Sequence, residues 1–177
     1  MKRRLGTWCA VAFVAAGVIV RAAEVVRILP IVRDDQVVVS CELADAYTDD
    51  VRDAISSGLR TTFTYDLELR MVVPAWVDRT IATSVVSTSD QYDNLTRRHS
   101  LTRIVNGRVD EATVTEDEAV VRQFLTSLTR VPLSRTSKLI SNRDYYVRIS
   151  ARARPRGSSV FSFADAITGS AKFTFIP

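Results

Sequence analysis

The sequence predicts a single α+β domain: a mainly antiparallel, curved β-sheet of about six to eight strands with two helices. Several segments alternate apolar and polar residues with a period of two, which is typical of strands with one buried face and one wet face. Two other segments place apolar residues at helical spacing behind residues that can cap a helix. The 177 residues, 46% hydrophobic and 25% charged, are sufficient for one buried core.

The N-terminus has the layout of a secretory signal. Three basic residues lie in the first four positions, residues 5–20 are mostly apolar, and small residues allow cleavage between Ala22 and Ala23. We predict a signal peptide over residues 1–22, export to the periplasm, and no membrane span after cleavage. The alternative is an uncleaved anchor in the inner membrane. A 16-residue helix is only about 24 Å long, less than the roughly 30 Å hydrocarbon core, which favours cleavage.

The net charge of +4 lies almost entirely in this N-terminal segment. Four of the 24 basic residues fall in the first 22 positions, where there is no acid, which leaves 20 basic against 20 acidic residues. A formally neutral domain has no strong electrostatic reason to bind nucleic acid or anionic lipid. We therefore predict no nucleic-acid partner.

The first elements follow an N-terminal segment, residues 23–36, which we predict to be extended. Residues 37–43 alternate as a half-buried strand, with Cys41 on its apolar side, so its thiol is expected to be buried and inert. Thr48 can cap a helix that starts with two aspartates and carries an apolar stripe. Gly58 suits the end of that helix.

The clearest strand covers residues 63–73, where apolar side chains occupy the odd positions and polar ones the even positions up to residue 70. Pro74 ends it, and we expect Trp76 to plug one end of the core. Residues 80–92 and 95–105 predict two further strands.

Asn106 and Gly107 form a two-residue hairpin signal, because both residues tolerate positive φ, and residues 108–114 are the predicted returning strand. Thr115 and Glu118 match a capping box that opens the second helix. The expected core face of that helix comprises Ala119, Val121, Phe124, Leu125 and Leu128.

A second alternating strand runs through residues 145–154, and closing strands are predicted at 160–163 and 171–176. The solvent-facing side chains of the strand at 145–154 are the best candidate for a partner surface: Tyr146, Arg148, Arg152 and Arg154. A charged strand face that resists aggregation explains the same arginines, and this reading is favoured.

The sequence predicts no catalytic, cofactor-binding or metal-binding residue and no enzymatic activity. His99 is the only histidine and lies among charged neighbours on a strand pattern, so we interpret it as a structural or surface residue. A hydrolase built around it would need a nucleophile and an orienting acid nearby in space. No nucleotide-binding loop is present, and one histidine with one mature-chain cysteine cannot build a typical zinc site.

Five segments resemble the DUF4390 family of exported bacterial proteins: Ile55–Leu59, Thr64–Arg70, Trp76–Asp78, Gln91–Thr96 and Asp144–Ile149. The resemblance extends from about Val37 to Ile176 and implies one DUF4390-like α+β domain over residues 37–177. It also implies an exported protein, and it supplies no catalytic residue.

Two functions remain open on the sequence. The first is a periplasmic interaction module whose partner is an envelope or membrane protein. The alternative is a carrier of an apolar ligand, held in a cavity under the curved sheet. Six aromatic residues could line such a cavity, but the favoured interpretation is that they fill the core. They are Phe63, Tyr65, Trp76, Phe161, Phe173 and Phe175. The oligomeric state is left open.

Overall fold

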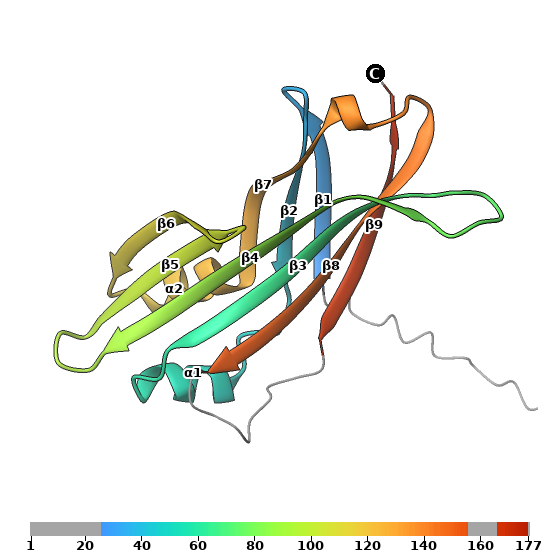
Figure 1. Ribbon diagram of the computed structural model, residues 1–177. Helices are drawn as coiled ribbons and strands as arrows, with labels where there is room; N and C mark the ends of the chain where they lie inside the picture. Colours follow the sequence, from blue (N-terminus) through green and yellow to red (C-terminus); the bar gives the residue numbers. More distant parts are fainter. Residues whose placement is uncertain (1–25, 156–165, 177) are drawn as a thin grey trace, which may run out of the picture.

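The computed structural model describes residues 26–155 and 166–176, and within them it confirms the α+β class (Figure 1). Nine mostly antiparallel strands and two α-helices make up this part of the chain. The strands are β1 (Val26–Arg33), β2 (Gln36–Leu43), β3 (Thr61–Met71), β4 (Arg79–Asp93), β5 (Arg98–Val105), β6 (Arg108–Thr115), β7 (Ser127–Arg135), β8 (Arg143–Pro155) and β9 (Ile167–Phe175). The helices are α1 (Asp49–Ser56), α2 (Glu118–Thr126) and a 3₁₀ turn, η1 (Thr136–Lys138).

The larger sheet has six strands in the order β6-β5-β4-β3-β8-β9. Its centre is β3, which pairs along its length with β4 on one side and with β8 on the other. The predicted alternation of β3 is confirmed, since Phe63, Tyr65, Leu67 and Leu69 are buried and the residues between them are half-buried. This sheet therefore has a buried inner face and an outer face, and both helices pack against its β3–β4 part.

The smaller sheet has the order β1-β2-β7. Residues 26–33, predicted only as an extended segment, form β1 and pair with β2 across a turn at Asp34 and Asp35. Both aspartates have positive φ, 50° and 58°. A hairpin turn without glycine or asparagine is a weak sequence signal, so the pairing was not expected.

The two sheets meet where β1 lies against β9. A Cβ at Gly169 would lie 2.9 Å from the Cβ of Val26, so only glycine fits this junction without a shift. At the other end of the arrangement α2 connects β6 to β7, one strand of each sheet. The strands therefore divide over two sheets that enclose one core.

The caps of the two helices differ in how well they match the sequence prediction. Thr48 caps α1 as expected, its hydroxyl accepting from the N–H of Val51 at 3.4 Å, and Gly58 follows the helix with a φ of 76°. For α2 the predicted cap, Thr115, is wrong. Asp117 is the cap, and its carboxylate accepts from the N–H of Ala119 at 2.8 Å. Thr115 instead ends β6, because strand pairing continues to that residue.

The core face predicted for α2 needs two corrections. Ala119 is exposed, and Leu128 is buried but belongs to β7, because the chain turns from helix to strand at Ser127 without an intervening loop. Val121, Phe124 and Leu125 are buried as predicted.

Trp76 does not plug the core: it is 81% exposed. The turn between β3 and β4 carries it beyond the end of the sheet, where no other element covers it in the described residues (Figure 1). The predicted cleavage site at Ala22 and Ala23 and the predicted strand at 160–163 lie outside the described residues. Within residues 26–155 and 166–176, no helix is long and apolar enough to cross a membrane.

Candidate functional site

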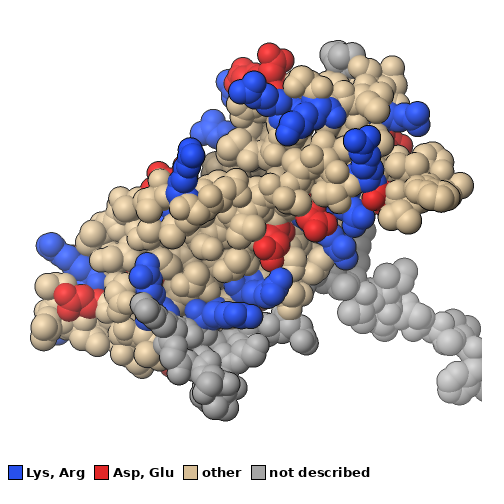
Figure 2. Space-filling view, viewed as in Figure 1, with Lys and Arg blue, Asp and Glu red and all other residues tan. Residues whose placement is uncertain are grey.

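The outer face of the six-stranded sheet brings the predicted surface residues together. Odd residues of β8 point into the core, where Tyr145, Val147 and Ile149 are fully buried. Because strand side chains alternate, the even residues share the outer face. They include Tyr146, Arg148, Arg152 and Arg154. Figure 2 shows this side of the molecule, with positive and negative side chains interspersed along the sheet.

A shallow groove of about 420 Å³ crosses this face between β4, β3, β8 and β9. In it Arg152 pairs with Asp66 at 3.0 Å, and Arg148 lies opposite Glu68 in the strand register. Glu68 in turn lies 4.0 Å from the guanidinium of Arg70. Arg148 is exposed and forms no ion pair within the part of the chain that the structure describes. Among the described residues, Arg148 is thus a cation without an ion pair, and the other charged side chains that line the groove are each paired.

Tyr146 is less accessible than the sequence predicted. Its ring is half-buried, its hydroxyl donates to Asp78 Oδ2 at 3.0 Å, and the Arg70 guanidinium lies 6.0 Å from the ring centre. Burial and the bond to Asp78 raise the pKa of the Tyr146 hydroxyl. Tyr146 therefore links the sheet to the β3–β4 turn.

Asp78 holds this turn, residues 72–78, in a fixed form. Its Oδ1 accepts from the N–H of Val73 at 3.2 Å, and its carbonyl accepts from Arg70 Nη2 at 3.1 Å. Ala75 has a positive φ of 61°, and the N–H of Trp76 donates to the carbonyl of Val73 at 3.2 Å. Trp76 is consequently displayed at the tip of a braced turn. The signal for this was present in the sequence: a proline shortly precedes Trp76, and an aspartate able to accept from turn amides follows it. The strand ends at Met71, three residues before the proline that was expected to end it.

His99 is buried, not at the surface, and its Nδ1 lies 2.8 Å from Asp90 Oδ2. Asp90 is fully buried, and its Oδ1 has no hydrogen-bond partner in the described residues. Burial raises the pKa of the Asp90 carboxyl, and the bond to His99 opposes part of that rise. The ring of Tyr92 lies 4.5 Å from that of His99. The sequence did not predict the pairing of Asp90 with His99, whose side chains both face inward from the β4–β5 hairpin.

A second groove, of about 450 Å³, reaches His99 between α1 and the start of α2. The hydroxyl in it that could act as a nucleophile, Ser56, donates to the carbonyl of Asp53 at 3.0 Å. Among the described residues His99 makes its hydrogen bond to Asp90 and none to a serine, threonine or cysteine. The pair orients an imidazole ring, which is one part of an acid–base site.

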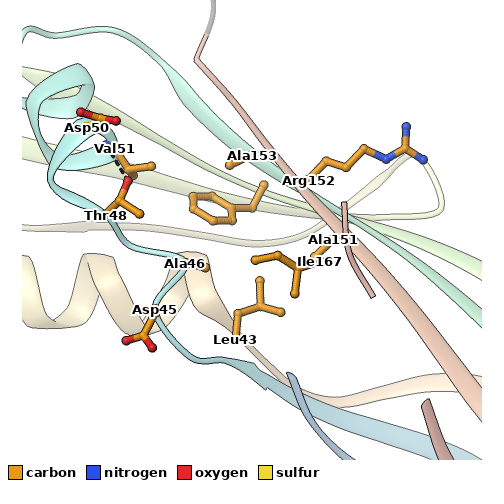
Figure 3. A pocket seen from close by; sticks show the side chains of 11 residues that line it. Leu43, Asp45, Ala46, Thr48, Asp50, Val51, Ala151, Arg152, Ala153 and Ile167 are labelled. Carbon is orange, nitrogen blue, oxygen red and sulfur yellow. Dashed lines mark hydrogen bonds between the residues drawn. The ribbon is translucent and has the colours of Figure 1, made fainter. Parts of the chain in front are cut away.

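A cavity of about 250 Å³ opens between the sheets beside α1 (Figure 3). Leu43 and Ile167 point into it, whereas the Arg152 side chain leads away. Its walls are mostly apolar and include Phe63 and Val51. Of the other aromatic residues proposed to line a ligand cavity, Tyr65 and Phe175 are buried in the core, Phe173 packs partly against it, and Trp76 lies outside. Phe161 lies outside the described residues.

Within residues 26–155 and 166–176, no group of three or more His, Cys, Asp or Glu side chains is placed to hold a metal ion.

Comparison with known proteins gives one match. A family model described as a domain of unknown function, DUF4390, matches residues 21–156. The match includes β1 and stops before β9. No curated protein and no solved structure matches the chain.

Proposed function

Because the chain belongs to the DUF4390 family, whose description assigns no activity, we propose a function from its own surface. The protein is exported to the periplasm, performs no catalysis, and binds a protein of the cell envelope through the outer face of its six-stranded sheet. The N-terminal layout of positive start, apolar stretch and small cleavage residues supports the export.

The observation on which the binding function rests is the groove around Arg148. The inner face of the sheet is buried against the core, while Arg148 on the outer face is exposed and has no ion pair in the described part of the chain. Arginine is enriched at protein interfaces because its planar guanidinium can bond a carboxylate with two hydrogen bonds. A partner that presents an acidic side chain to this groove fits the site best.

The test is cross-linking of the tagged protein in intact cells, followed by mass spectrometry of what is recovered. Arg148→Glu should abolish recovery of the partner, because it places a like charge against the acidic group. Arg122→Glu is the matched control: it reverses an exposed arginine on α2, which packs against the inner face of the sheet, the side opposite the groove. A partner that survives charge reversal at Arg148, Arg152 and Arg154 together would refute this site.

The same preparation tests export. N-terminal sequencing of the periplasmic fraction should begin at Ala23. Protein found only in the membrane fraction with Met1 still attached would instead establish the uncleaved anchor.

The cavity beside α1 supports a second candidate, a carrier of an apolar ligand. Its volume of about 250 Å³ lies just below the roughly 300–1,000 Å³ usual for small-molecule sites, so it suits a single short acyl chain. Native mass spectrometry of the purified protein should then show a bound lipid. Protein free of lipid whose unfolding temperature does not change with added fatty acid would eliminate the carrier.

A further inference from the structure

The turn between β3 and β4 exposes the largest apolar side chain of the described surface. Trp76 is 81% exposed and its neighbour Val77 is 73% exposed. The turn projects from the sheet in Figure 1, and in Figure 2 the projection is a mainly uncharged surface with positive and negative side chains at its base. The exposed surfaces of Trp76 and Val77 adjoin at the tip of the turn, and adjoining apolar surface of this kind is a feature of protein and membrane contact sites.

The exposure is built into the structure. The carboxylate of Asp78 bonds both the amide of Val73 and the hydroxyl of Tyr146, at 3.2 and 3.0 Å. Arg70 bonds the carbonyl of Asp78. The turn cannot fold its apolar residues back onto the sheet without breaking these bonds. The backbone that carries Trp76 is therefore held in place before contact, so little backbone entropy is lost on binding.

Further apolar and basic side chains lie at the same end of the molecule. Ile140 is 53% exposed and lines a hollow with Arg79 and Lys138 at the base of the β3–β4 turn. Ile176 is 74% exposed. The carbonyl of the residue before it, Phe175, accepts a hydrogen bond from the N–H of Asn142 at 2.8 Å, which places Ile176 beside the connection between η1 and β8. Arg79, Lys138 and Arg143 are all exposed. Of the acids beside them, Asp78 is occupied by its internal bonds, and Asp144 is exposed and accepts from Thr174 Oγ1 at 2.7 Å, so the cations outnumber the acids here.

We propose that this end docks the protein onto a lipid bilayer, with Trp76 at the boundary between headgroups and acyl chains. Tryptophan favours that depth because its ring is apolar and its N–H can bond the headgroup region. Basic residues around an apolar tip add attraction to anionic headgroups. The net neutrality of the mature domain does not oppose this, because the cations near the tip act locally within a Debye length. The inference is independent of the groove on the sheet face, which uses other residues.

The chain supplies its own reporter, because Trp8 lies in the signal segment and Trp76 is then the single tryptophan of the mature protein. Mature protein is mixed with vesicles of phosphatidylglycerol and phosphatidylcholine, or of phosphatidylcholine alone. The anionic vesicles should sediment the protein and shift Trp76 emission to the blue, and brominated acyl chains should quench it. Vesicles of phosphatidylcholine alone should bind more weakly.

Trp76→Ser should weaken sedimentation with anionic vesicles on the order of tenfold, since it removes one large apolar side chain from the contact. Leu95→Ser is the matched control. Leu95 is 95% exposed in the β4–β5 turn, at the opposite end of β4, and its replacement should leave binding unchanged. Both side chains are exposed, so neither change disturbs the core, and circular dichroism should show the same fold for both.

Three results would overturn the proposal. The first is the absence of both sedimentation and a blue shift with anionic vesicles. The second is equal binding by Trp76→Ser and the unchanged protein. The third is protection of Trp76 from a soluble quencher by an envelope protein but not by vesicles, which would assign the tip to a protein partner.

Discussion

Two buried hydroxyls share one backbone carbonyl at the end of α2. The carbonyl of Leu125 is among the last four of the helix, which have no partner within the helix itself. It accepts from the hydroxyl of Tyr65 and from Thr88 Oγ1, the latter at 3.1 Å. All three residues are buried, so water cannot replace either donor. We predict that removing the donors singly and together will have unequal effects.

Tyr65→Phe and Thr88→Val each remove one donor and leave the other on the carbonyl of Leu125. Each should lower the free energy of unfolding by about 1 kcal/mol, the usual net value of one hydrogen bond. The double variant leaves a buried carbonyl with no donor, which adds a desolvation cost of about 1–3 kcal/mol. The double variant should therefore lose about 3–5 kcal/mol, more than the sum of the single losses.

Urea unfolding of the mature protein, followed by far-ultraviolet circular dichroism, measures all four free energies. In thermal unfolding each single change should lower Tm by about 2–4 °C. Thr64→Val is the matched control, because Thr64 is half-buried on the outer face of the same strand as Tyr65 and should change stability by less than about 0.5 kcal/mol. A double variant whose loss equals or falls below the sum would show that the two hydroxyls do not satisfy the same carbonyl.

Three further predictions concern other buried positions. Burial raises the pKa of the Asp90 carboxyl, so above about pH 3.9 the folded protein keeps a proton that the unfolded chain releases. The free energy of unfolding should therefore fall as the pH rises from about 3.9 to the pKa of Asp90 in the folded protein, and it should level off above that pKa. Asp90→Asn should remove that fall in urea unfolding across this range, and an unchanged pH dependence would contradict the reasoning. Gly169→Ala should cost about 1–3 kcal/mol at the β1–β9 junction, because its Cβ would lie 2.9 Å from Val26; an unaltered Tm would disprove so close an approach. Burial raises the pKa of the Cys41 thiol to about 12, so a thiol reagent at neutral pH should label the folded mature protein far more slowly than the protein in urea, and equal rates would count against a buried thiol.

Periodicity in the sequence predicted the centre of the fold. The alternation at residues 63–73 and 145–154 corresponds to β3 and β8, which pair with each other. The structure buries the selected side chains from Phe63 to Leu69 and from Tyr145 to Ala151, whereas Met71 and Ala153 are half-buried and Val73 lies in the turn after β3. The turn at Asn106 and Gly107 was also predictable, because positive φ at both positions is a local requirement that these residue types meet.

The division into two sheets was not predictable from local patterns. The segment 127–135 follows α2 without a turn, so its first apolar residue, Leu128, continues the helical pattern and the sequence predicts it as part of the helix. In the structure this segment pairs with β2, about 90 residues earlier in the chain. Distant pairing of this kind overrides local propensity and leaves no mark within one window of sequence.

For the candidate site, the sequence predicted which side chains share one face of the strand but not their contacts with other elements. Alternation placed Arg148 and Arg152 on the same side of a strand, and the structure agrees. The sequence did not reveal that Tyr146 is bound to Asp78 or that Asp90 meets His99. Each of these depends on contacts between strands whose register was unknown.

The position of β3 at the middle of the six-stranded sheet has a consequence for the growing chain. Its partner β4 follows within a few residues, but the other partner, β8, begins only at Arg143. Until β8 is synthesised, one edge of β3 has open amides and carbonyls, a template for pairing with other chains. Folding is thus completed by the C-terminal strands, and a chain cut before residue 143 would aggregate instead of forming a smaller folded protein.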